Sequence, residues 1–354
     1  MIITRSALLA ALDKVRPAID ARGVLPSQAY VAIDEAKGKM WASRNGLFVG
    51  VDFDSSNDPN KKGYSVDYQE LYNAIKPLPE APIAMVLDNT MLSISSGRAK
   101  VDVTAWPSKD VSVMKAKEGA EATLSKKDIL RAVQLSGLTA SSAVSTPALE
   151  CVFYNKGQMV ATDRHVMGVI GGCSEDIQIT KLLSRDVLGA LSAADVPEEG
   201  VSLKGNTVSW PGHVIRFQEV DALFLDYRAI IPDSTLWPRA TIKVSDMTTA
   251  IKIGGVSADP TTNVLKVSLL SDGQLVISAH TGDQRSSSYS IDVEYSDTPL
   301  EFLINRLNFS DIFSRIKVEE ATLAWPGHGA FVEVRESDDV VYYLGRLQEL
   351  NQVK

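Results

Sequence analysis

Apolar residues recur along the chain with two different periods. Between Ile3 and Ile19, the residues Leu8, Leu12 and Val15 recur every three or four positions, so they would lie on one face of a helix. Five other stretches show the same period. The pattern predicts six helices, at Ile3–Ile19, Val66–Pro77, Leu124–Leu138, Lys181–Ala194, Lys243–Ser257 and Glu301–Lys317.

Most of the remaining apolar residues alternate with polar ones over short segments. Examples are AYVAID at 29–34, LFVGVDF at 47–53 and VVYYLG at 340–345. Alternation with a period of two is typical of antiparallel strands that bury one face. We therefore expect an α+β fold in which pairs of helices pack on a predominantly antiparallel sheet.

Glycine positions indicate that the chain repeats itself. The segments KGKMWAS, KGQMVAT and DGQLVIS are typical of hairpins, and their glycines at 38, 157 and 273 lie 119 and 116 residues apart. A second set of glycines, at 97, 212 and 327, has a spacing of 115. We interpret the chain as three tandem copies of one domain, with boundaries at 1–117, 118–235 and 236–354.

The tetrapeptide WPGH occurs twice, at Trp210–His213 and at Trp325–His328. Tryptophan, proline, glycine and histidine together could form a site. Because both copies contain a glycine of the second repeating set, we interpret them instead as the same structural turn in the second and third domains.

Composition excludes several classes of protein. The 354 residues are 45% hydrophobic and 23% charged, and no apolar run approaches the roughly 18 residues of a membrane span. The first residues do not follow the pattern of a signal peptide. Two cysteines, Cys151 and Cys173, cannot by themselves form a disulfide framework or a zinc site. We expect a soluble, cytoplasmic protein without membrane contact.

Charge is distributed unevenly between helices and the rest of the chain. The net charge is −8, yet the six predicted helices together carry +6, so the other residues hold −14. If the helices shared one face, that face would attract phosphates while the remaining surface repelled nucleic acid. The alternative is that the helices are merely exposed and happen to be basic.

Sequence motifs of catalysis are absent. The chain has no phosphate-binding loop, dinucleotide fingerprint, nucleophile elbow or HExxH motif, and its four histidines lack metal-ligand spacing. Asp163 and His165 are two residues apart on a predicted strand and could form an acid–histidine pair. We predict no catalytic residue, no cofactor and no metal; a hydrolase that uses Asp163 and His165 is an alternative.

Four segments resemble the bacterial sliding clamp, the DNA polymerase III beta subunit. They are SGRAKVDVTAWPSKDV at 96–111, MVATDRHVMGV at 159–169, FLDYRAIIP at 224–232 and VVYYLGRL at 340–347. The chain departs from the family at Arg164–Val166, where Gly-His-Arg is usual, and at Tyr343–Gly345, where Met-Pro-Met is usual. Gln348–Lys354 also extends past the usual end.

The resemblance implies a head-to-tail homodimer that closes six domains into a ring around double-stranded DNA, with helices lining the hole. Such a clamp is a non-catalytic processivity factor in DNA replication. Phosphate contacts would come from basic residues on or near the helices: Arg22, Lys126, Lys127, Arg131, Lys243, Lys252, Arg306 and Arg315.

The resemblance also implies partners that bind through short linear peptides, namely the DNA polymerase catalytic subunit and the clamp loader. By motif position, the peptide pocket would use Leu149, Thr162, His165, Met167, Pro232, Leu344 and Arg346. Val101 and Val103 would lie in the dimer interface. A clamp-fold scaffold that binds partner peptides without encircling DNA is a further alternative.

Overall fold

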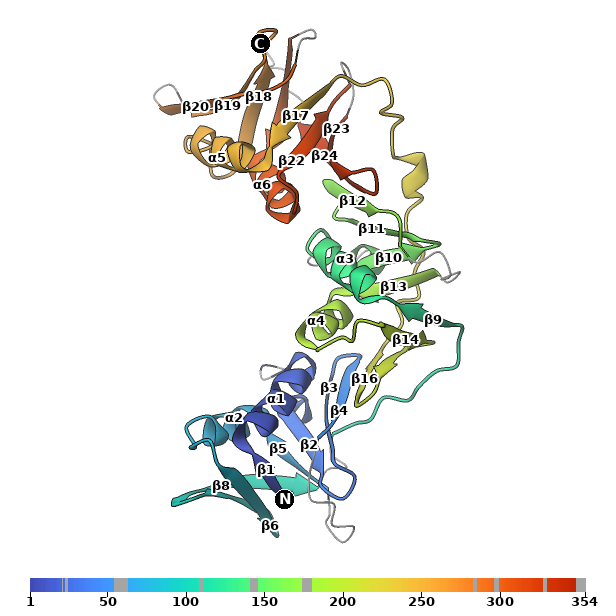
Figure 1. Ribbon diagram of the computed structural model, residues 1–354, viewed down its shortest axis with the longest axis vertical. Coiled ribbons are helices and arrows are strands. Elements are labelled where there is room, and N and C mark those ends of the chain that lie inside the picture. The colour runs from blue at the N-terminus through green and yellow to red at the C-terminus, as the bar shows by residue number, and fades with distance from the viewer. Residues whose placement is uncertain are drawn as a thin grey trace. The chain divides into compact units, whose positions relative to one another are not determined.

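The computed structural model describes residues 1–20, 22, 25–53, 63–107, 111–140, 146–173, 180–282, 285–295, 299–326 and 330–347. Within these residues the element order β-α-β-β-β-β-α-β-β-β occurs three times (Figure 1). The predicted three-copy α+β organisation is therefore confirmed.

The elements of the three copies correspond one to one. The first copy contains β1 (Ile2–Thr4), α1 (Arg5–Val15), β2 (Tyr30–Asp34), β3 (Lys39–Arg44), β4 (Leu47–Asp52), β5 (Tyr64–Asp67), α2 (Tyr68–Ile75), β6 (Pro82–Asp88), β7 (Met91–Ser96) and β8 (Ala99–Pro107). The second contains β9 (Glu121–Leu124), α3 (Lys126–Ser136), β10 (Cys151–Asn155), β11 (Gln158–Thr162), β12 (Val166–Ile170), β13 (Thr180–Ser184), α4 (Arg185–Ala193), β14 (Val201–Lys204), β15 (Thr207–Trp210) and β16 (His213–Phe217). The third contains β17 (Arg239–Lys243), α5 (Val244–Gly254), β18 (Val264–Leu269), β19 (Gln274–Thr281), β20 (Arg285–Asp292), β21 (Leu300–Asn305), α6 (Arg306–Arg315), β22 (Glu320–Ala324), β23 (Phe331–Ser337) and β24 (Val340–Leu347).

Each helix directly follows a strand, and a polar residue at the junction usually caps it. Thr4, Asp67, Ser184 and Asn305 accept hydrogen bonds from backbone N–H groups of the first turn of α1, α2, α4 and α6. Ser125 does the same for α3. The predicted helices at 181–194 and 301–317 therefore began too early, because Thr180–Ser184 and Leu300–Asn305 are strands.

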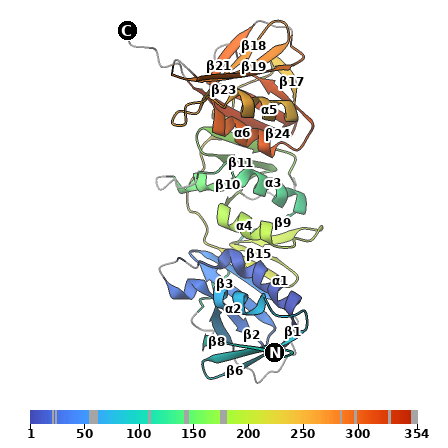
Figure 2. The same ribbon diagram turned by 90° about the vertical axis from the view of Figure 1, so that its left-hand side faces the viewer.

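The chain forms two compact units. The first comprises Met1–Val133 and Ser174–Asp221, and the second comprises Gln134–Cys173 and Ala222–Lys354. The second copy contributes elements to both units. In the first unit twelve strands form one sheet, in the order β1-β6-β7-β8-β5-β2-β3-β4-β16-β15-β14-β9. Helix α1 packs against β3 and β4, and α2 packs against β5 and β8. The two helices also contact each other and lie side by side (Figure 2).

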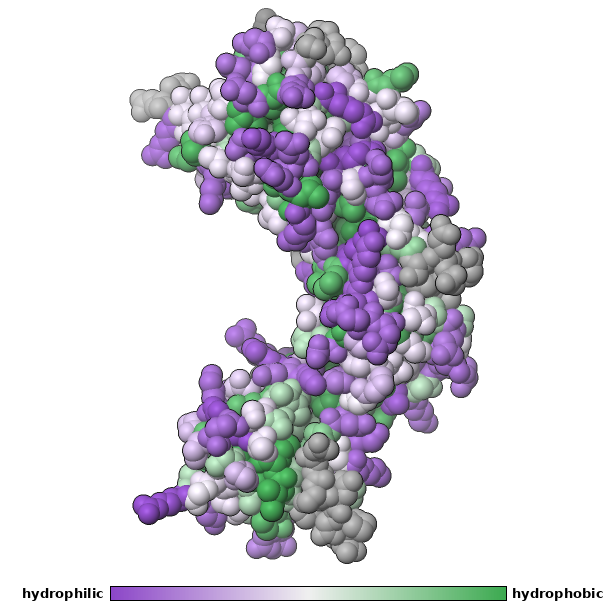
Figure 3. All heavy atoms as spheres, viewed as in Figure 1, coloured by the Kyte–Doolittle hydropathy of each residue, from purple (hydrophilic) through white to green (hydrophobic). Residues whose placement is uncertain are grey.

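The second unit has the same construction. Its strands follow the order β10-β11-β12-β24-β21-β18-β19-β20. In addition, β24 pairs with β23, β23 with β22, and β22 with β17. Helix α5 packs against β19 and β20, and α6 packs against β21 and β24. In both units the visible face is mostly hydrophilic, and a band of hydrophobic residues runs along the first unit (Figure 3).

The two WPGH segments do not form the same turn, contrary to our interpretation. Trp210 and His213 close the hairpin between β15 and β16, and their rings stack at 4.7 Å. Trp325 instead follows β22 and precedes β23, a connection that corresponds to the one between β14 and β15. Gly327 and His328 lie outside the described residues. The turn that matches the β15–β16 turn is the β7–β8 turn, where Gly97 has a φ of +59° and Gly212 has a φ of +75°.

Candidate functional site

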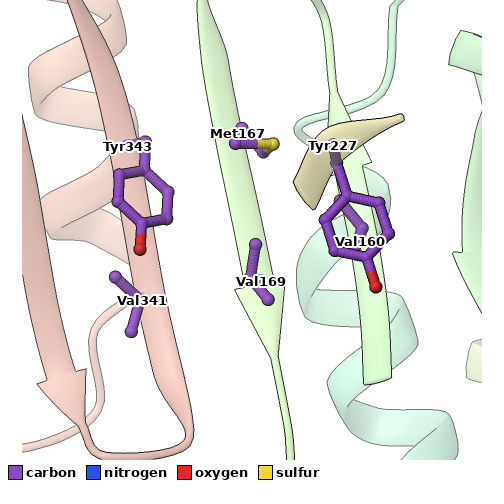
Figure 4. Close-up of a cluster of buried hydrophobic side chains, with 6 residues drawn as sticks. All are labelled: Val160, Met167, Val169, Tyr227, Val341 and Tyr343. Carbon is purple, nitrogen blue, oxygen red and sulfur yellow. The ribbon is translucent and has the colours of Figure 1, made fainter. Parts of the chain in front are cut away.

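Six buried side chains form a cluster on one face of the second unit's sheet. They come from β11, β12, β24 and the short 3-10 helix Tyr227–Ala229: Val160, Met167, Val169, Tyr227, Val341 and Tyr343 (Figure 4). Strand register explains the grouping, because residues paired across strands point to the same face. Val160 pairs with Val169, Met167 with Tyr343, and Val169 with Val341.

The segment 218–238 joins the last strand of the second copy to the first strand of the third, and we call it the connector. It covers the cluster with Phe224, Leu225 and Ile231, which pack there together with Phe153 of β10. The Phe153 and Phe224 rings stack at 4.6 Å with an angle of 8° between their planes. Tyr227 enters the cluster from the connector, and its hydroxyl donates to Gln158 Oε1 at 2.8 Å. We call the six residues the connector cluster.

A buried carboxylate fastens the connector to the sheet. Glu333 of β23 is fully buried and accepts a hydrogen bond from Ser234 Oγ at 2.5 Å. Arg335 Nη2 lies 3.0 Å from Glu333 Oε1, and Arg239 Nη1 lies 3.7 Å from the same oxygen. Burial, followed by the charge of Glu333, raises the pKa of the nearby Tyr343 phenol to about 12. The two arginines compensate a charge that would otherwise be costly to bury.

A tightly braced turn connects β11 to β12 beside the connector cluster. Asp163 Oδ1 accepts hydrogen bonds from the backbone N–H groups of His165 and Val166, both at 2.8 Å. Thr162 Oγ1 donates to Val166 O at 2.7 Å and accepts from Arg164 N at 3.0 Å. The expectation that Asp163 and His165 lie on a strand is wrong, because β11 ends at Thr162 and β12 begins at Val166. Asp163 Oδ1 therefore braces the backbone of the turn.

The predicted pocket residues divide between two sides of the sheet. Thr162 pairs with Met167 and therefore faces the connector cluster, and Pro232 follows Ile231 in the covering segment. His165 is exposed in the turn. Leu344 and Arg346 are offset from Tyr343 by one and three residues, so they face the opposite side of β24. Leu149 is buried in the 3-10 helix Pro147–Glu150.

Sequence reasoning missed several members of the connector cluster, namely Val160, Val169, Tyr227, Val341 and Tyr343. The alternation in VVYYLG indicates a strand but does not show which strand lies beside it. Met167 and Tyr343 are neighbours only because β12 and β24 pair across almost half of the chain. Glu333 was missed because a carboxylate in an apolar strand has no sequence signal for its compensating arginines.

The predicted DNA-binding residues differ in whether their charged groups already have partners within the protein. Lys126 forms an ion pair with Glu198 at 2.5 Å. Arg315 is bound to the Asp311 carboxylate and donates from Nη1 to Gln134 O at 2.9 Å. Arg306 donates to Asn263 Oδ1 at 3.2 Å. The remaining candidates are Arg131, which is partly buried, and Arg22, Lys127, Lys243 and Lys252, which are exposed.

The predicted dimer-interface residues lie on β8. Val101 is partly buried and pairs with Ile94, and Val103 is 9% exposed and pairs with Leu92. On the other edge of β8, only residues 105–107 pair with a further described strand, β5. The edge formed by Ala99–Thr104 has no partner strand among the described residues.

Metal and thiol chemistry have little support in the described part of the chain. No group of three or more histidine, cysteine, aspartate or glutamate side chains there is arranged to hold a metal ion. Cys151 and Cys173 are both buried, and burial raises the pKa of Cys151 to about 12. Among these residues no helix is long and apolar enough to cross a membrane.

The three-copy architecture, with sheets that continue from one copy to the next, is that of a bacterial sliding clamp. The DNA polymerase III subunit beta of Pseudomonas aeruginosa superimposes with a TM-score of 0.88 at 18% identity, over 98% of this chain and 99% of that one. The sliding clamp of Bartonella birtlesii bound to griselimycin has a TM-score of 0.88 at 19% identity, over 98% of this chain and 99% of that one. The DNA polymerase sliding clamp of Bacillus subtilis has a TM-score of 0.86 at 14% identity, over 98% of each chain.

Sequence comparison agrees with the structural likeness. The beta sliding clamp of Proteus mirabilis is 22% identical over 350 residues, which is 91% of this chain and 92% of that protein. No protein-family model matches the chain. The resemblance inferred from the sequence segments is therefore confirmed, and the fold is established over nearly the whole chain.

Proposed function

We propose that this protein is a DNA sliding clamp. Two copies would associate head to tail into a ring around duplex DNA and tether the replicative DNA polymerase, as well as other partners such as a clamp loader. The observation that carries the proposal is a rule of strand pairing between successive copies of the domain.

The rule is the same at both junctions inside the chain. Strand β4 of the first copy pairs with β16 of the second, through five residue pairs from Leu47↔Phe217 to Val51↔His213. Strand β12 of the second copy pairs with β24 of the third, also through five residue pairs. Applied once more, the rule pairs β20 of the third copy with β8 of another molecule. Among the described residues, β20 ends its sheet and Ala99–Thr104 of β8 has one edge without a partner strand, so both edges are available. Repeated head-to-tail contacts of this kind form a ring when the rotation between chains closes.

The surroundings of β20 support the same assembly. A cavity of about 570 Å³ lies beside it, lined by Lys243 of β17, Asp246 of α5 and Tyr289 of β20, among others. At the junction between the first two copies, α4 of the second copy packs against α1 and β4 of the first, which are the counterparts of α5 and β20. The counterpart of α4 is α2, so helix α2 of the partner molecule would occupy this space.

We propose domain boundaries at 1–117, 118–235 and 236–354. Strands β1, β9 and β17 begin at residues 2, 121 and 239, so the element order restarts within a few residues of each boundary. The two compact units do not follow these boundaries, because the second copy shares a continuous sheet with each of its neighbours.

A clamp that slides should hold DNA only through its phosphates. Exposed lysines on helices suit this role because their long side chains reach phosphates without reading bases. Lys127 and Lys252 are exposed on α3 and α5, and neither has a carboxylate partner among the described residues. Lys126 and Arg315 would contribute less to binding, since their charges are already paired with the carboxylates of Glu198 and Asp311.

Partner peptides would bind beside the connector cluster, where Thr162, Met167 and Pro232 lie. Leu236 on the connector is 95% exposed, which leaves apolar surface for an anchor side chain of the peptide. Griselimycin, which is bound in a structure of the Bartonella birtlesii clamp, is a useful probe of this surface. We propose that the protein has no catalytic activity and works in the cytoplasm.

The retention of the protein on circular DNA, compared with linear DNA, tests the proposed function directly. Protein loaded onto nicked circular DNA by a bacterial clamp loader should co-elute with the DNA, and cutting the circle should release it. Protein that is never retained on circles, but still binds griselimycin as a monomer, would instead be a clamp-fold scaffold.

A matched pair of variants tests the dimer interface. Val101→Asp places a charge at the free edge of β8 and should convert the dimer to a monomer at micromolar concentration. Val86→Asp is the control, because Val86 is 61% exposed on β6, away from that edge. A dimer that survives Val101→Asp would place the interface elsewhere.

A further inference from the structure

Arg164 has an unusual backbone conformation next to the proposed peptide site. Its φ is +79°, in the left-handed region that non-glycine residues rarely adopt. The hydrogen bonds of the turn from Thr162 to Val166 hold it there. A strained, long and charged side chain at such a position points to a function for that side chain, since glycine would satisfy the turn at lower cost.

The nearest acidic side chain does not neutralise Arg164 through an ion pair. Asp163 directs Oδ1 to two backbone N–H groups of the turn. The side chain of Arg164 is exposed, and its Nη2 donates to the neutral hydroxyl of Thr146 at 2.7 Å. Among the described residues, no carboxylate lies within ion-pair distance of it. Its remaining guanidinium donors are therefore available to an external acceptor.

Arg164 also lies where it can contact a ligand of the connector cluster. The turn begins at Thr162 and ends at Val166, next to Met167 of the connector cluster, and Thr162 pairs with Met167. Gly345 N donates to His165 O at 3.0 Å, so β24 supports the same turn. A peptide anchored beside Met167 would pass within reach of an exposed guanidinium, and arginine binds carboxylates with two parallel hydrogen bonds.

We propose that Arg164 is a specificity-determining residue that selects partner peptides with an acidic residue next to their apolar anchor. The inference rests on the proposed peptide-binding function and narrows it to one class of partner. An exposed ion pair of this kind favours an acidic over a neutral peptide by about fivefold. The preference should disappear in about 1 M salt, where charges are screened within about 3 Å.

Fluorescence polarisation with two peptides tests the proposal. The probes are fluorescein-Gly-Ser-Asp-Asp-Leu-Leu-Phe-Gly and the same peptide with two asparagines in place of the aspartates. The full-length protein should bind the acidic peptide about fivefold more tightly at low salt. Arg164→Asn should reduce the ratio to about one, and Arg164→Asp should favour the neutral peptide. Both substitutions preserve the turn, because asparagine and aspartate tolerate a positive φ.

Arg228 provides the matched control. It is also exposed, and its Nη2 donates to the neutral Gln158 Oε1 at 3.3 Å, at the opposite end of β11 from Arg164. Arg228→Ala should leave the peptide preference unchanged. Equal affinity of wild-type protein for both peptides, an unchanged ratio in Arg164→Asn, or no binding of either peptide would overturn the inference. Retention of the wild-type protein on circular DNA would then still support the proposed clamp function.

Discussion

Replacing Arg335 by alanine should destabilise the protein more than replacing Glu333 by glutamine, although both changes break the same ion pair. The reason is unequal burial. The Glu333 side chain is fully buried, whereas Arg335 and Arg239 keep 26% and 34% of their side-chain surface exposed. Water can therefore hydrate the arginines after the loss of Glu333, but it cannot reach a carboxylate that has lost Arg335.

The magnitudes follow from the contacts. Arg335→Ala removes a hydrogen bond from Nε and an ion-pair contact from Nη2 to Glu333, both at 3.0 Å. The carboxylate then keeps only Ser234 and the more distant Arg239. We expect a loss of about 3 kcal/mol in the free energy of unfolding, the lower end for a broken buried pair. Glu333→Gln keeps an acceptor for Ser234 and should cost about 1.5 kcal/mol. The double variant should cost less than the sum of the two, because the residues interact directly.

Urea unfolding followed by tryptophan fluorescence measures these free energies. Trp325 is 1% exposed in the same domain copy and serves as a reporter. Equal losses in the two single variants, or a larger loss in Glu333→Gln, would show that unequal burial does not control the stability of this ion pair. The connector would then be held mainly by the apolar contacts of its aromatic residues.

Three further results are expected. Met167→Ala should weaken peptide binding about thirtyfold in a polarisation titration, because truncating a central anchor site costs about 2 kcal/mol. Light scattering should still find a dimer, and an unchanged peptide affinity would place the site elsewhere. Lys127→Ala and Lys252→Ala should each reduce the slope of log affinity for duplex DNA against log salt by about 0.9, and an unaltered slope would mean that the lysine does not contact phosphate. The pKa of Tyr343 is raised to about 12 in the folded protein, so the unfolded chain loses this proton first as the pH rises above about 10. The contribution of the phenol to the free energy of unfolding is therefore complete below that pH and falls by about 1.4 kcal/mol at pH 11. Tyr343→Phe should reduce this loss between pH 9 and pH 11 in urea titrations, and an identical loss would contradict the assignment.

Local patterns in the sequence predicted the repeated elements well. The hairpin glycines Gly38, Gly157 and Gly273 all have positive φ values, of 60°, 77° and 83°, as turns of this kind require. Their spacing gave a repeat length that matches the starts of β1, β9 and β17. Helix starts were less accurate, since a short strand that leads directly into a helix has too few residues to show its own period.

The composition of the candidate site could be predicted only in part. Thr162, Met167 and Pro232 lie in or next to segments that resemble known clamps, and the structure brings them to the connector cluster. Tyr343 was not predicted, because its contact with Met167 depends on the register between two strands far apart in the sequence. The interpretation of the two WPGH segments as one turn was wrong for a related reason. The order of the surrounding strands, rather than the tetrapeptide, decides which connection each segment occupies.

The mass of the protein in solution tests the central claim most directly. The pairing rule leaves one free edge on β8 and one on β20, and a closed head-to-tail ring satisfies both edges in every chain. The resemblance to bacterial sliding clamps implies that this ring contains two chains. Multi-angle light scattering at micromolar concentration should therefore give about twice the chain mass of 38.4 kDa, with Val101→Asp giving a single chain. A wild-type protein that remains at the mass of one chain across that concentration range would contradict the ring.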